Sequence, residues 1–425
     1  MLLFGAPRGL TAQQPTQAQV DSLRAEIARL TAALDSLRSR VGSPAAPEPA
    51  PQNELARLRA AAAAAAANAG APDTARPAPQ EFVGRQRSLQ ALNPEISLTG
   101  DFFGAVRSMD ASEDNFVPRE IELALQSALD PFSRAKVFAG IETPGIDVAP
   151  FEEGAAEEEH GGGISIEEAY LEWVNLPGGI SAKVGQFYQQ FGTMNRWHSH
   201  ALYSHSRSLP ALAFIGEEPL AQAGVSIHWL APTSLLGGTY QVTGELTRSS
   251  NETLFGTSTG PTWLGHLNAF YPLGSAFDLD LGMSALTGRA VTEAAEFDRH
   301  VWTVEGALTW SPPGRTLYRG LVLRGGVLNR SGVPAGPGSA RGAWGLFETR
   351  LSQQWYLGGR ADWSENPEDP DSTARLFGPT LTWWQSEYVR LRAEYAWLDG
   401  SASEGSGLFT LQFTWSMGPH KHETY

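Results

Sequence analysis

The last strand-like segment of the chain, residues 406–417, has the sequence SGLFTLQFTWSM. Its large apolar side chains stand at alternate positions, namely Phe409, Leu411, Phe413, Trp415 and Met417. Small or polar residues fill the positions between them. Successive side chains of a β-strand point to opposite faces, so this segment predicts a strand with one apolar and one polar face. Residues 389–397 and 302–310 repeat the pattern, and charged residues occupy their polar face.

Segments of this kind follow one another over residues 93–418, and we count sixteen. They are predicted to start near Glu95, Val117, Ser133, Ile164, Ile180, Gly224, Leu235, Trp263, Phe277, His300, Leu317, Ala343, Trp355, Ala374, Tyr388 and Ser406. Short and long connections alternate between them. An even strand number with short turns at one end and long loops at the other is typical of bacterial outer-membrane barrels.

The fold class predicted from these segments is all-β, a transmembrane antiparallel β-barrel with both termini on the periplasmic side. A soluble β-sandwich would show the same alternation. Aromatic residues near the strand ends, such as Trp302 and Trp310, favour the membrane barrel because an interfacial girdle requires them there. Full charges on the opposite face suit a solvent-filled lumen.

The composition narrows the choice further. Charged residues make up 18% of the 425 residues, below the roughly 25% of soluble domains. The chain has no cysteine, which excludes disulfides and thiolate metal sites, and its net charge of −15 argues against a nucleic-acid partner. No run of 18 apolar residues occurs, so a membrane-spanning chain of this sequence must cross as a closed barrel.

The region before the barrel differs in composition and in the spacing of its apolar residues. A heptad stripe with alternating spacings of 3 and 4 is formed by Val20, Leu23, Ile27, Leu30, Leu34, Leu37 and Val41. It predicts a coiled coil over residues 14–42, with a single amphipathic helix packed on a domain as the alternative. Residues 43–92 are an Ala/Pro-rich spacer, residues 1–13 a truncated signal peptide or a disordered leader, and residues 419–425 a periplasmic tail.

The alternation also assigns the lumen face of the barrel. The charged residues predicted to line the lumen are Glu120, Glu122, Lys136, Glu168, Glu172, Lys183, Arg324, Arg350, Arg360, Arg390, Arg392 and Glu394. Acids predominate on the early strands and arginines on the later ones. We expect the two sets to face each other across the pore and to create a transverse field. The alternative is that they pair locally and keep the interior hydrated.

The longest connection, from about Gln189 to Ala221, is predicted to be the third extracellular loop and to fold into the channel. The residues expected to form the constriction are Arg196, Trp197, His198, His200, His205 and Arg207. Imidazoles are common metal ligands. Their spacing here lacks the i, i+4 regularity of a helical site and no carboxylate stands beside them, so we expect packing and hydrogen bonding, with no metal and no cofactor.

Two further features bear on function. The second loop carries five glutamates between residues 152 and 159, which favours either a cation-attracting mouth or a solvated loop bridged to lipopolysaccharide by divalent cations. Sequence motifs of nucleotide binding, zinc proteases and serine hydrolases are absent, so an enzyme is not expected.

The layout resembles that of the general and phosphate-selective porins of Gram-negative outer membranes. The resemblance rests on the sixteen-stranded layout behind a coiled coil, on NPEISLTGDF at residues 93–102 and on KVGQF at residues 183–187. It implies a trimeric diffusion channel in the cell outer membrane with the coiled coil in the periplasm. The family's lysine cluster and arginine ladder cannot be placed residue by residue, so phosphate selectivity is not carried over.

The function expected from the sequence is passive diffusion of small hydrophilic solutes or ions. The expected partners are outer-membrane lipid, lipopolysaccharide and further copies of the chain in a homotrimer. The alternative is a structural anchor that links the outer membrane to peptidoglycan through the coiled coil.

Overall fold

The computed structural model describes residues 94–107, 115–142, 151, 164–232, 234, 236–332, 338–369, 371–400 and 403–418. The predicted leader, coiled coil and spacer lie outside these residues. So do the glutamates at 152–159 and the predicted tail at 419–425.

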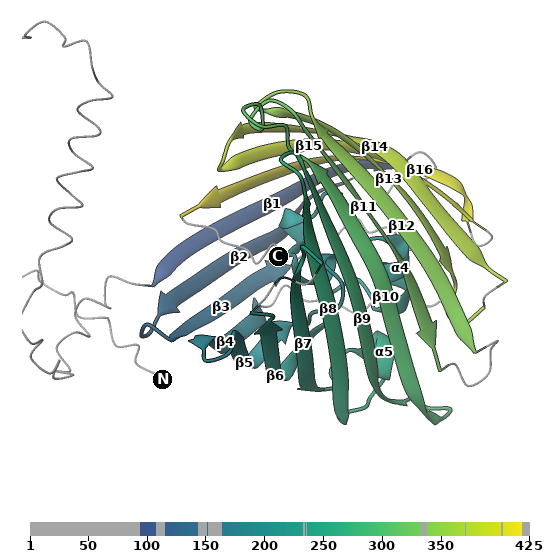
Figure 1. Cartoon of the computed structure of the whole chain (residues 1–425). Helices are drawn as coiled ribbons and strands as arrows, with labels where there is room; N and C mark the ends of the chain where they lie inside the picture. The colour runs from purple at the N-terminus through teal and green to yellow at the C-terminus, as the bar shows by residue number, and fades with distance from the viewer. Residues whose placement is uncertain are drawn as a thin grey trace, which may run out of the picture. The chain divides into compact units, whose positions relative to one another are not determined.

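The described residues form one closed antiparallel barrel of sixteen strands (Figure 1). Each strand pairs with its neighbours in the chain, and β1 closes the barrel against β16. The strands are β1 (Glu95–Arg107), β2 (Asn115–Ala128), β3 (Ser133–Glu142), β4 (Ile164–Leu176), β5 (Ile180–Tyr188), β6 (Ala221–Leu230), β7 (Thr239–Arg248), β8 (Pro261–Leu273), β9 (Phe277–Val291), β10 (Glu296–Trp310), β11 (Gly320–Ser331), β12 (Ser339–Arg350), β13 (Trp355–Glu365), β14 (Thr373–Ser386), β15 (Val389–Gly400) and β16 (Ser403–Met417). The predicted fold class and strand number are confirmed.

The strands present their two faces to different surroundings, as the alternation predicted. On β16, Phe409 and Leu411 are 44% and 46% exposed, whereas Thr410 and Gln412 between them are 1% exposed. Exposed large apolar side chains recur on almost every strand. An apolar belt of this extent is typical of a wall that faces lipid. No helix in the described ranges is long and apolar enough to cross a membrane.

The alternation of short and long connections holds in the first half of the barrel and weakens in the second. Residues 177–179 join β4 to β5, whereas residues 189–220 join β5 to β6. On the long-loop end, however, residues 292–295 suffice between β9 and β10. Polar segments that look like loop sequence continue the ladder there, with Glu296 paired to Val291 and Arg289 bonded to Glu296 at 3.0 Å. Polar strand extensions beyond the apolar belt therefore replace the predicted loop.

Two register shifts change which residues point inward. The ladder between β1 and β2 shifts at Asp101/Phe102, opposite Arg119, and the ladder between β3 and β4 shifts at Phe138/Ala139, opposite Glu167. A β-bulge places two residues of one strand opposite a single residue of its partner, which interrupts strict alternation. Arg119 and Glu167 therefore join their neighbours in the interior, where both are buried.

The connection between β5 and β6 lies against the inner wall. It contains η3 (Met194–Arg196), η4 (Ser199–Ala201) and α4 (Leu209–Phe214), and the next long connection contains α5 (Glu252–Phe255). Two apolar clusters hold these elements. Phe214 and Leu220 pack with Leu264 and Leu286, while Leu209 packs with Leu376 and its neighbours. Inward apolar residues thus bind the loop in place of lining an open lumen.

Candidate functional site: the loop inside the barrel

The candidate site is the β5–β6 loop, residues 189–220, together with the inner wall that it contacts. Its two ends are joined, because the Gln189 N–H donates to the Leu220 carbonyl at 2.9 Å. Gly192 has a φ of 66°, a left-handed conformation that glycine adopts readily, and the chain turns inward there. The Gly192 N–H then donates to Oγ of Ser284 at 2.9 Å, and the Thr193 N–H donates to Glu305 at 2.6 Å.

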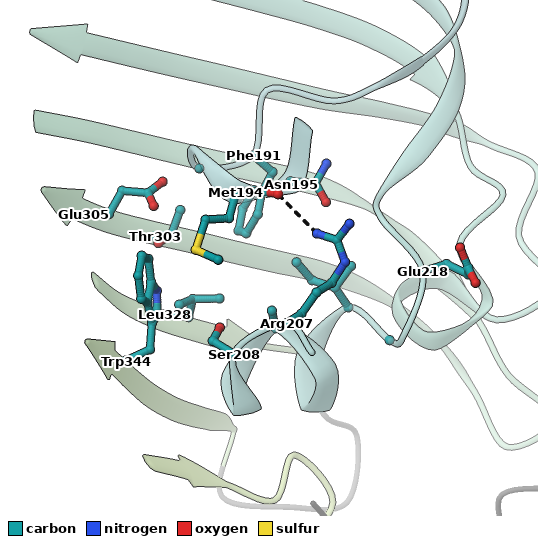
Figure 2. Close-up of a pocket in the computed structure, with 14 residues that line it drawn as sticks. Phe191, Met194, Asn195, Arg207, Ser208, Glu218, Thr303, Glu305, Leu328 and Trp344 are labelled. Atoms are coloured by element: carbon teal, nitrogen blue, oxygen red, sulfur yellow. Dashed lines mark hydrogen bonds between the residues drawn. The ribbon is translucent and has the colours of Figure 1, made fainter. Parts of the chain in front are cut away.

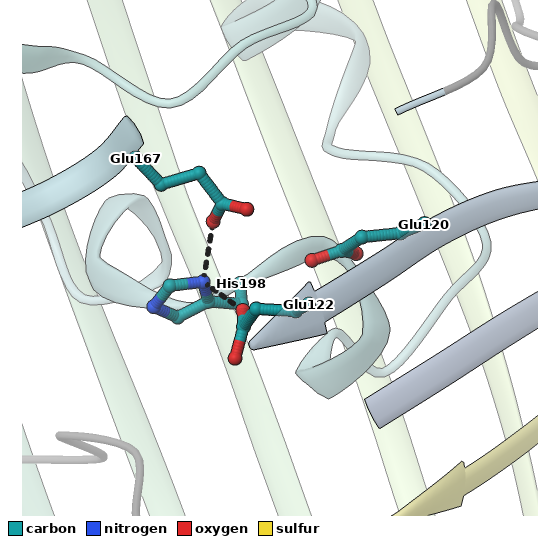
Figure 3. A group of neighbouring side chains, drawn as sticks. All are labelled: Glu120, Glu122, Glu167 and His198. Carbon is teal, nitrogen blue, oxygen red and sulfur yellow. Dashed lines mark hydrogen bonds and ion pairs between the residues drawn. The ribbon is translucent and has the colours of Figure 1, made fainter. Parts of the chain in front are cut away.

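On the side of β2 and β4, the loop presents histidine side chains to carboxylates. Nδ1 of His198 lies 2.6 Å from Oε2 of Glu122 and 2.7 Å from Oε2 of Glu167. Its ring lies between those of Phe138 and Tyr188, with both centroids 4.7 Å away. Figure 3 shows the two carboxylates converging on this imidazole from different strands. We call Glu120, Glu122, Glu167 and His198 the acidic cluster.

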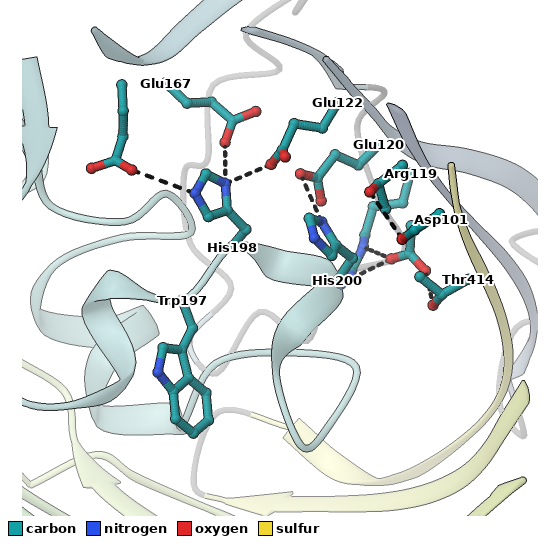
Figure 4. Close-up of polar contacts among 12 residues, drawn as sticks. Asp101, Arg119, Glu120, Glu122, Glu167, Trp197, His198, His200 and Thr414 are labelled. Carbon is teal, nitrogen blue, oxygen red and sulfur yellow. Dashed lines mark hydrogen bonds and ion pairs between the residues drawn. The ribbon is translucent and has the colours of Figure 1, made fainter. Parts of the chain in front are cut away.

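His200 continues this network toward the barrel closure. Its Nδ1 lies 3.2 Å from Oε1 of Glu120. Beside it, Arg119 forms an ion pair with Asp101 and donates to the His205 carbonyl at 2.6 Å (Figure 4). Hydroxyl and amide groups of β16 also donate to Asp101, so the carboxylate is fully engaged. The bulge residue Arg119 therefore joins the wall to the loop.

The two neighbouring histidines have opposite electrostatic environments. Burial disfavours the charged form of His198, but the Glu122, Glu167 and Glu168 carboxylates outweigh it and raise the pKa of His198 well above its ordinary value. Burial lowers the pKa of His200 to about 4, against the attraction of Glu122 and with the repulsion of His198. At neutral pH His198 is thus an imidazolium and His200 a neutral imidazole, with ring centroids 5.9 Å apart.

On the side of β13 and β15, arginines of the wall donate hydrogen bonds to backbone carbonyls of the loop. Arg360 donates to the carbonyls of Ser206 and Arg207 at 3.2 and 2.9 Å. Arg392 donates to the Leu202 carbonyl at 2.7 Å, and Arg390 donates to the His200 carbonyl. We call Arg360, Arg390 and Arg392 the arginine set.

The helix α4 is held at both ends by charges of the wall. The Leu209 N–H at its start donates to Asp362 at 3.0 Å, and Arg330 donates to the Phe214 carbonyl at its end at 3.1 Å. A negative charge at the start and a positive charge at the end of a helix match the partial charges of its free N–H and C=O groups. His205 just before the helix donates its N–H to Glu394 at 2.9 Å.

The loop residues singled out from the sequence are all buried, with exposures between 2% and 9%: Arg196, Trp197, His198, His200, His205 and Arg207. Arg207 braces the loop internally, donating to the Met194 and Trp197 carbonyls at 3.2 and 3.0 Å. Trp197 packs against Tyr203, and the guanidinium of Arg324 lies 5.2 Å from the Trp197 ring.

The wall residues singled out from the sequence divide into two groups. Ten are buried: Glu120, Glu122, Lys136, Glu168, Glu172, Lys183, Arg360, Arg390, Arg392 and Glu394. Arg324 and Arg350 retain intermediate exposure. Near the end of β4, Glu172 accepts from Arg134 at 2.6 Å, while the Lys183 ammonium lies 4.9 Å from the Tyr170 ring.

The expectation that acids and arginines face each other across the pore is only partly met. In the barrel order, β15 is only three strands from β2, so Arg390 and Arg392 do not stand on the wall opposite the acids of β2. Arg360 on β13 lies seven strands from β4, close to the opposite wall, but it pairs with Asp362 at 2.5 Å. These contacts favour local pairing over a transverse field.

The loop histidines were expected to lack neighbouring carboxylates, but the fold brings carboxylates to them. No carboxylate stands beside His198 in the sequence, yet Glu167 comes within hydrogen-bond distance from 31 residues away and Glu120 reaches His200 from 80 residues away. Strict alternation also missed Arg119 and Glu167, because both point inward at bulges. The pairing of a charged residue with a charged neighbour, Arg119-Glu120 and Glu167-Glu168, was the signal available in the sequence.

A small pocket separates the loop from β10–β12 (Figure 2). Met194, Arg207, Glu305 and Trp344 are among its lining residues, and its volume is about 40 Å³. A buried water needs roughly 10–15 Å³ by this measure, so the pocket has room for a few waters. Water can therefore enter between the loop and these strands.

Comparison with known proteins identifies the fold of this chain but does not assign it to a family. No family model matches the chain. A stretch of 98 residues is 38% identical to an uncharacterized protein of Aquifex aeolicus, and it covers 22% of this chain and 19% of that relative. The chain therefore matches about a fifth of the length of this curated relative.

Among solved structures, the barrel is similar to those of outer-membrane porins. An anion-selective porin from Comamonas acidovorans is 12% identical with a TM-score of 0.54, over 76% of this chain and 99% of that one. OprB of Pseudomonas putida is 10% identical with a TM-score of 0.54, over 79% and 96%. The trimer form of OmpT, an outer membrane protein of Vibrio cholerae, is 9% identical with a TM-score of 0.50, over 76% and 99%. At these identities the likeness establishes the fold.

Proposed function

We propose that this protein is an outer-membrane porin through which small hydrophilic solutes or ions diffuse passively, and that the β5–β6 loop narrows its lumen. The observation that carries the proposal is the position of the loop. It is bonded to β2 and β4 on one side and to β13 and β15 on the other. A segment held against the inner wall of a barrel restricts the cross-section through which solutes pass.

The two faces of the wall support a membrane pore. The outer face carries an apolar belt, and the inner face carries charged side chains on most strands. Charged residues in a membrane protein are expensive unless they line water or pair with one another. The porins with similar barrels support the outer membrane as the location of the chain.

The proposed path runs along β8–β12, away from the acidic cluster. Inward residues there retain partial exposure: Asn268, Asp280, Arg324, Glu348 and Arg350. On β2 and β4, by contrast, the loop buries the inward charges. Mixed charges along the path suit small hydrophilic solutes and do not specify one ion.

Planar-bilayer recording of the purified protein tests this proposal. Stepwise current increments on insertion are expected, and their absence at every applied voltage would remove the pore. In a salt gradient, the double variant Arg324→Ala and Arg350→Ala should shift the reversal potential toward cation selectivity, because two positive charges leave the path. Arg289→Ala, at an exposed site near the strand ends, is the matched control with no expected shift.

The assembly and surroundings of the porin follow the same proposal. We expect a homotrimer in contact with lipid and lipopolysaccharide, supported by the trimer form of OmpT with its similar barrel. The resemblance to phosphate-selective porins and the periplasmic coiled coil at 14–42 remain predictions from the sequence. The alternative, anchorage to peptidoglycan, is tested by pull-down with residues 13–80; failure to bind would remove it.

A further inference from the structure

We propose that the acidic cluster is a binding site for one divalent transition-metal ion of the Zn²⁺ type, which clamps the β5–β6 loop to the barrel wall. This inference goes beyond diffusion through the pore and does not depend on it. The site joins Glu120 and Glu122 of β2, Glu167 of β4 and His198 of the loop. Figure 3 shows these side chains directed toward one another from three separate segments.

The donor atoms are already gathered. One atom from each of the four residues lies within 4.8 Å of the other three. All four residues are buried: Glu122 is 0% exposed, Glu120 and His198 2%, and Glu167 7%. Burial matters because carboxylates that are shielded from water need a compensating positive charge nearby.

Some carboxylate oxygens of the acidic cluster take no part in its hydrogen bonds. In the part of the chain that the structure describes, neither Oε2 of Glu120 nor Oε1 of Glu167 accepts a hydrogen bond. Buried polar atoms in proteins almost always have a partner. The nearest arginine, Arg119, is committed to Asp101 and to the His205 carbonyl. Two shielded carboxylate oxygens with no donor, on residues whose ligand atoms gather around an imidazole, point to a cation.

The ligand chemistry selects the class of ion. Calcium and magnesium prefer sites made of oxygen ligands, whereas an imidazole nitrogen suits zinc and its neighbours. Zinc coordinates histidine nitrogen and carboxylate oxygen at about 2.0–2.2 Å, so tetrahedral ligand atoms lie roughly 3.3 Å apart. Nδ1 of His198 is now 2.6 and 2.7 Å from its two carboxylate partners. Metal binding therefore requires a small opening of the cluster and the loss of the proton from Nδ1.

The surroundings of the cluster supply the second layer that metal sites use. The Tyr188 hydroxyl donates to Oε2 of Glu167 at 2.7 Å, and His200 lies 3.2 Å from Oε1 of Glu120. Hydrogen bonds of this kind orient the first ligands and tune their affinity. The ion would tie η4 to β2 and β4 at a single point, where hydrogen bonds now do so.

Isothermal titration of the untagged, chelator-treated full-length protein with ZnCl2 in detergent tests the proposal. Wild type is expected to bind one Zn²⁺ per protomer at this site. Glu122→Gln and His198→Ala should each weaken that binding at least tenfold. His228→Ala removes another buried wall histidine, one that bonds to Ser226 and Thr243 outside the cluster, and should leave the affinity unchanged. The double variant His420→Ala and His422→Ala controls for zinc held by the terminal histidines.

Two outcomes would overturn the proposal: no saturable binding by wild type, or binding that is lost in the terminal-histidine variant and retained in both cluster variants. If His198→Ala does not fold, Glu122→Gln decides, because it keeps the size of the side chain and removes its charge. Anomalous X-ray diffraction from zinc-soaked crystals provides an independent readout. A peak within coordination distance of His198 Nδ1 is expected, and a peak elsewhere alone would contradict the assignment.

Discussion

The loop inside this barrel is held from two sides in different ways. On the side of β2 and β4, the wall carboxylates contact loop side chains, the imidazoles of His198 and His200. On the side of β13 and β15, the arginine set contacts loop carbonyls, which every residue possesses. Each side has one contact of the other kind, because Arg119 of β2 donates to the His205 carbonyl and Glu394 of β15 lies 3.0 Å from Nδ1 of His205. The first side therefore depends mainly on which residues the loop carries, and the second depends mainly on the path of its backbone.

Arg360→Ala should produce the largest effect, because it breaks a buried pair with Asp362 and frees two loop carbonyls. Removing one partner of a buried ion pair typically costs about 3–5 kcal/mol. Native-state hydrogen exchange should show strongly reduced protection of the His205 and Leu209 amides, which donate to Glu394 and Asp362. Arg289→Ala, at a pair whose side chains are 60% and 58% exposed, is the control and should change little. Unchanged protection of these amides in Arg360→Ala would show that the hydrogen bonds from Arg360 to the loop carbonyls do not hold the loop in place.

His198→Ala should have the next largest effect. It removes the hydrogen bond to Glu167, the ion pair with Glu122 and the ring that packs against Phe138 and Tyr188. Hydrogen bonds to charged groups contribute roughly 1.5–3 kcal/mol, so amides around η4 should exchange about 10-fold to 150-fold faster. Because the arginine set remains, Leu209 should keep its protection. Equal loss at both places would show that the two sides act as one unit.

Ser206→Ala should have the smallest effect, although Arg360 donates a hydrogen bond to Oγ of Ser206 at 2.9 Å. The backbone carbonyl that Arg360 also contacts is unchanged by the substitution. The lost bond is to a charged guanidinium, but Arg360 keeps both loop carbonyls and Asp362, so a loss of about 1.5 kcal/mol, the lower end of the range for such bonds, is expected. A loss as large as that of His198→Ala would contradict the distinction between side-chain and backbone attachment.

The barrel was predictable from the sequence because its strands repeat one pattern of alternating apolar and polar residues. Alternation of apolar and polar residues on β16 follows from the pleat of a strand, and the same pattern recurs along the chain. Polar extensions such as Arg289 and Glu296 were harder, since beyond the apolar belt the outer face no longer needs apolar residues. There the strand and the loop look alike in sequence.

The sequence identified the loop of the interior site but did not identify the wall residues that contact it. The length of the β5–β6 connection and its histidines mark it in the sequence. Glu167 and Arg119 point inward because of bulges, and a bulge inserts one residue without a fixed sequence pattern. The meeting of His198 with Glu122 and Glu167 depends on barrel closure and on the inward fold of the loop. Neither is encoded by local spacing.

The single-channel conductance of a loop-shortened variant tests most directly whether the β5–β6 loop narrows the pore. Because Gln189 and Leu220 already pair at the root of the loop, residues 192–217 can be replaced by a Gly-Ser-Gly-Ser linker without stretching the strands. The variant is expected to show a severalfold larger conductance step than wild type, since the segment fixed against the inner wall is gone. A conductance equal to that of wild type in a correctly folded barrel would contradict the claim that this loop narrows the pore.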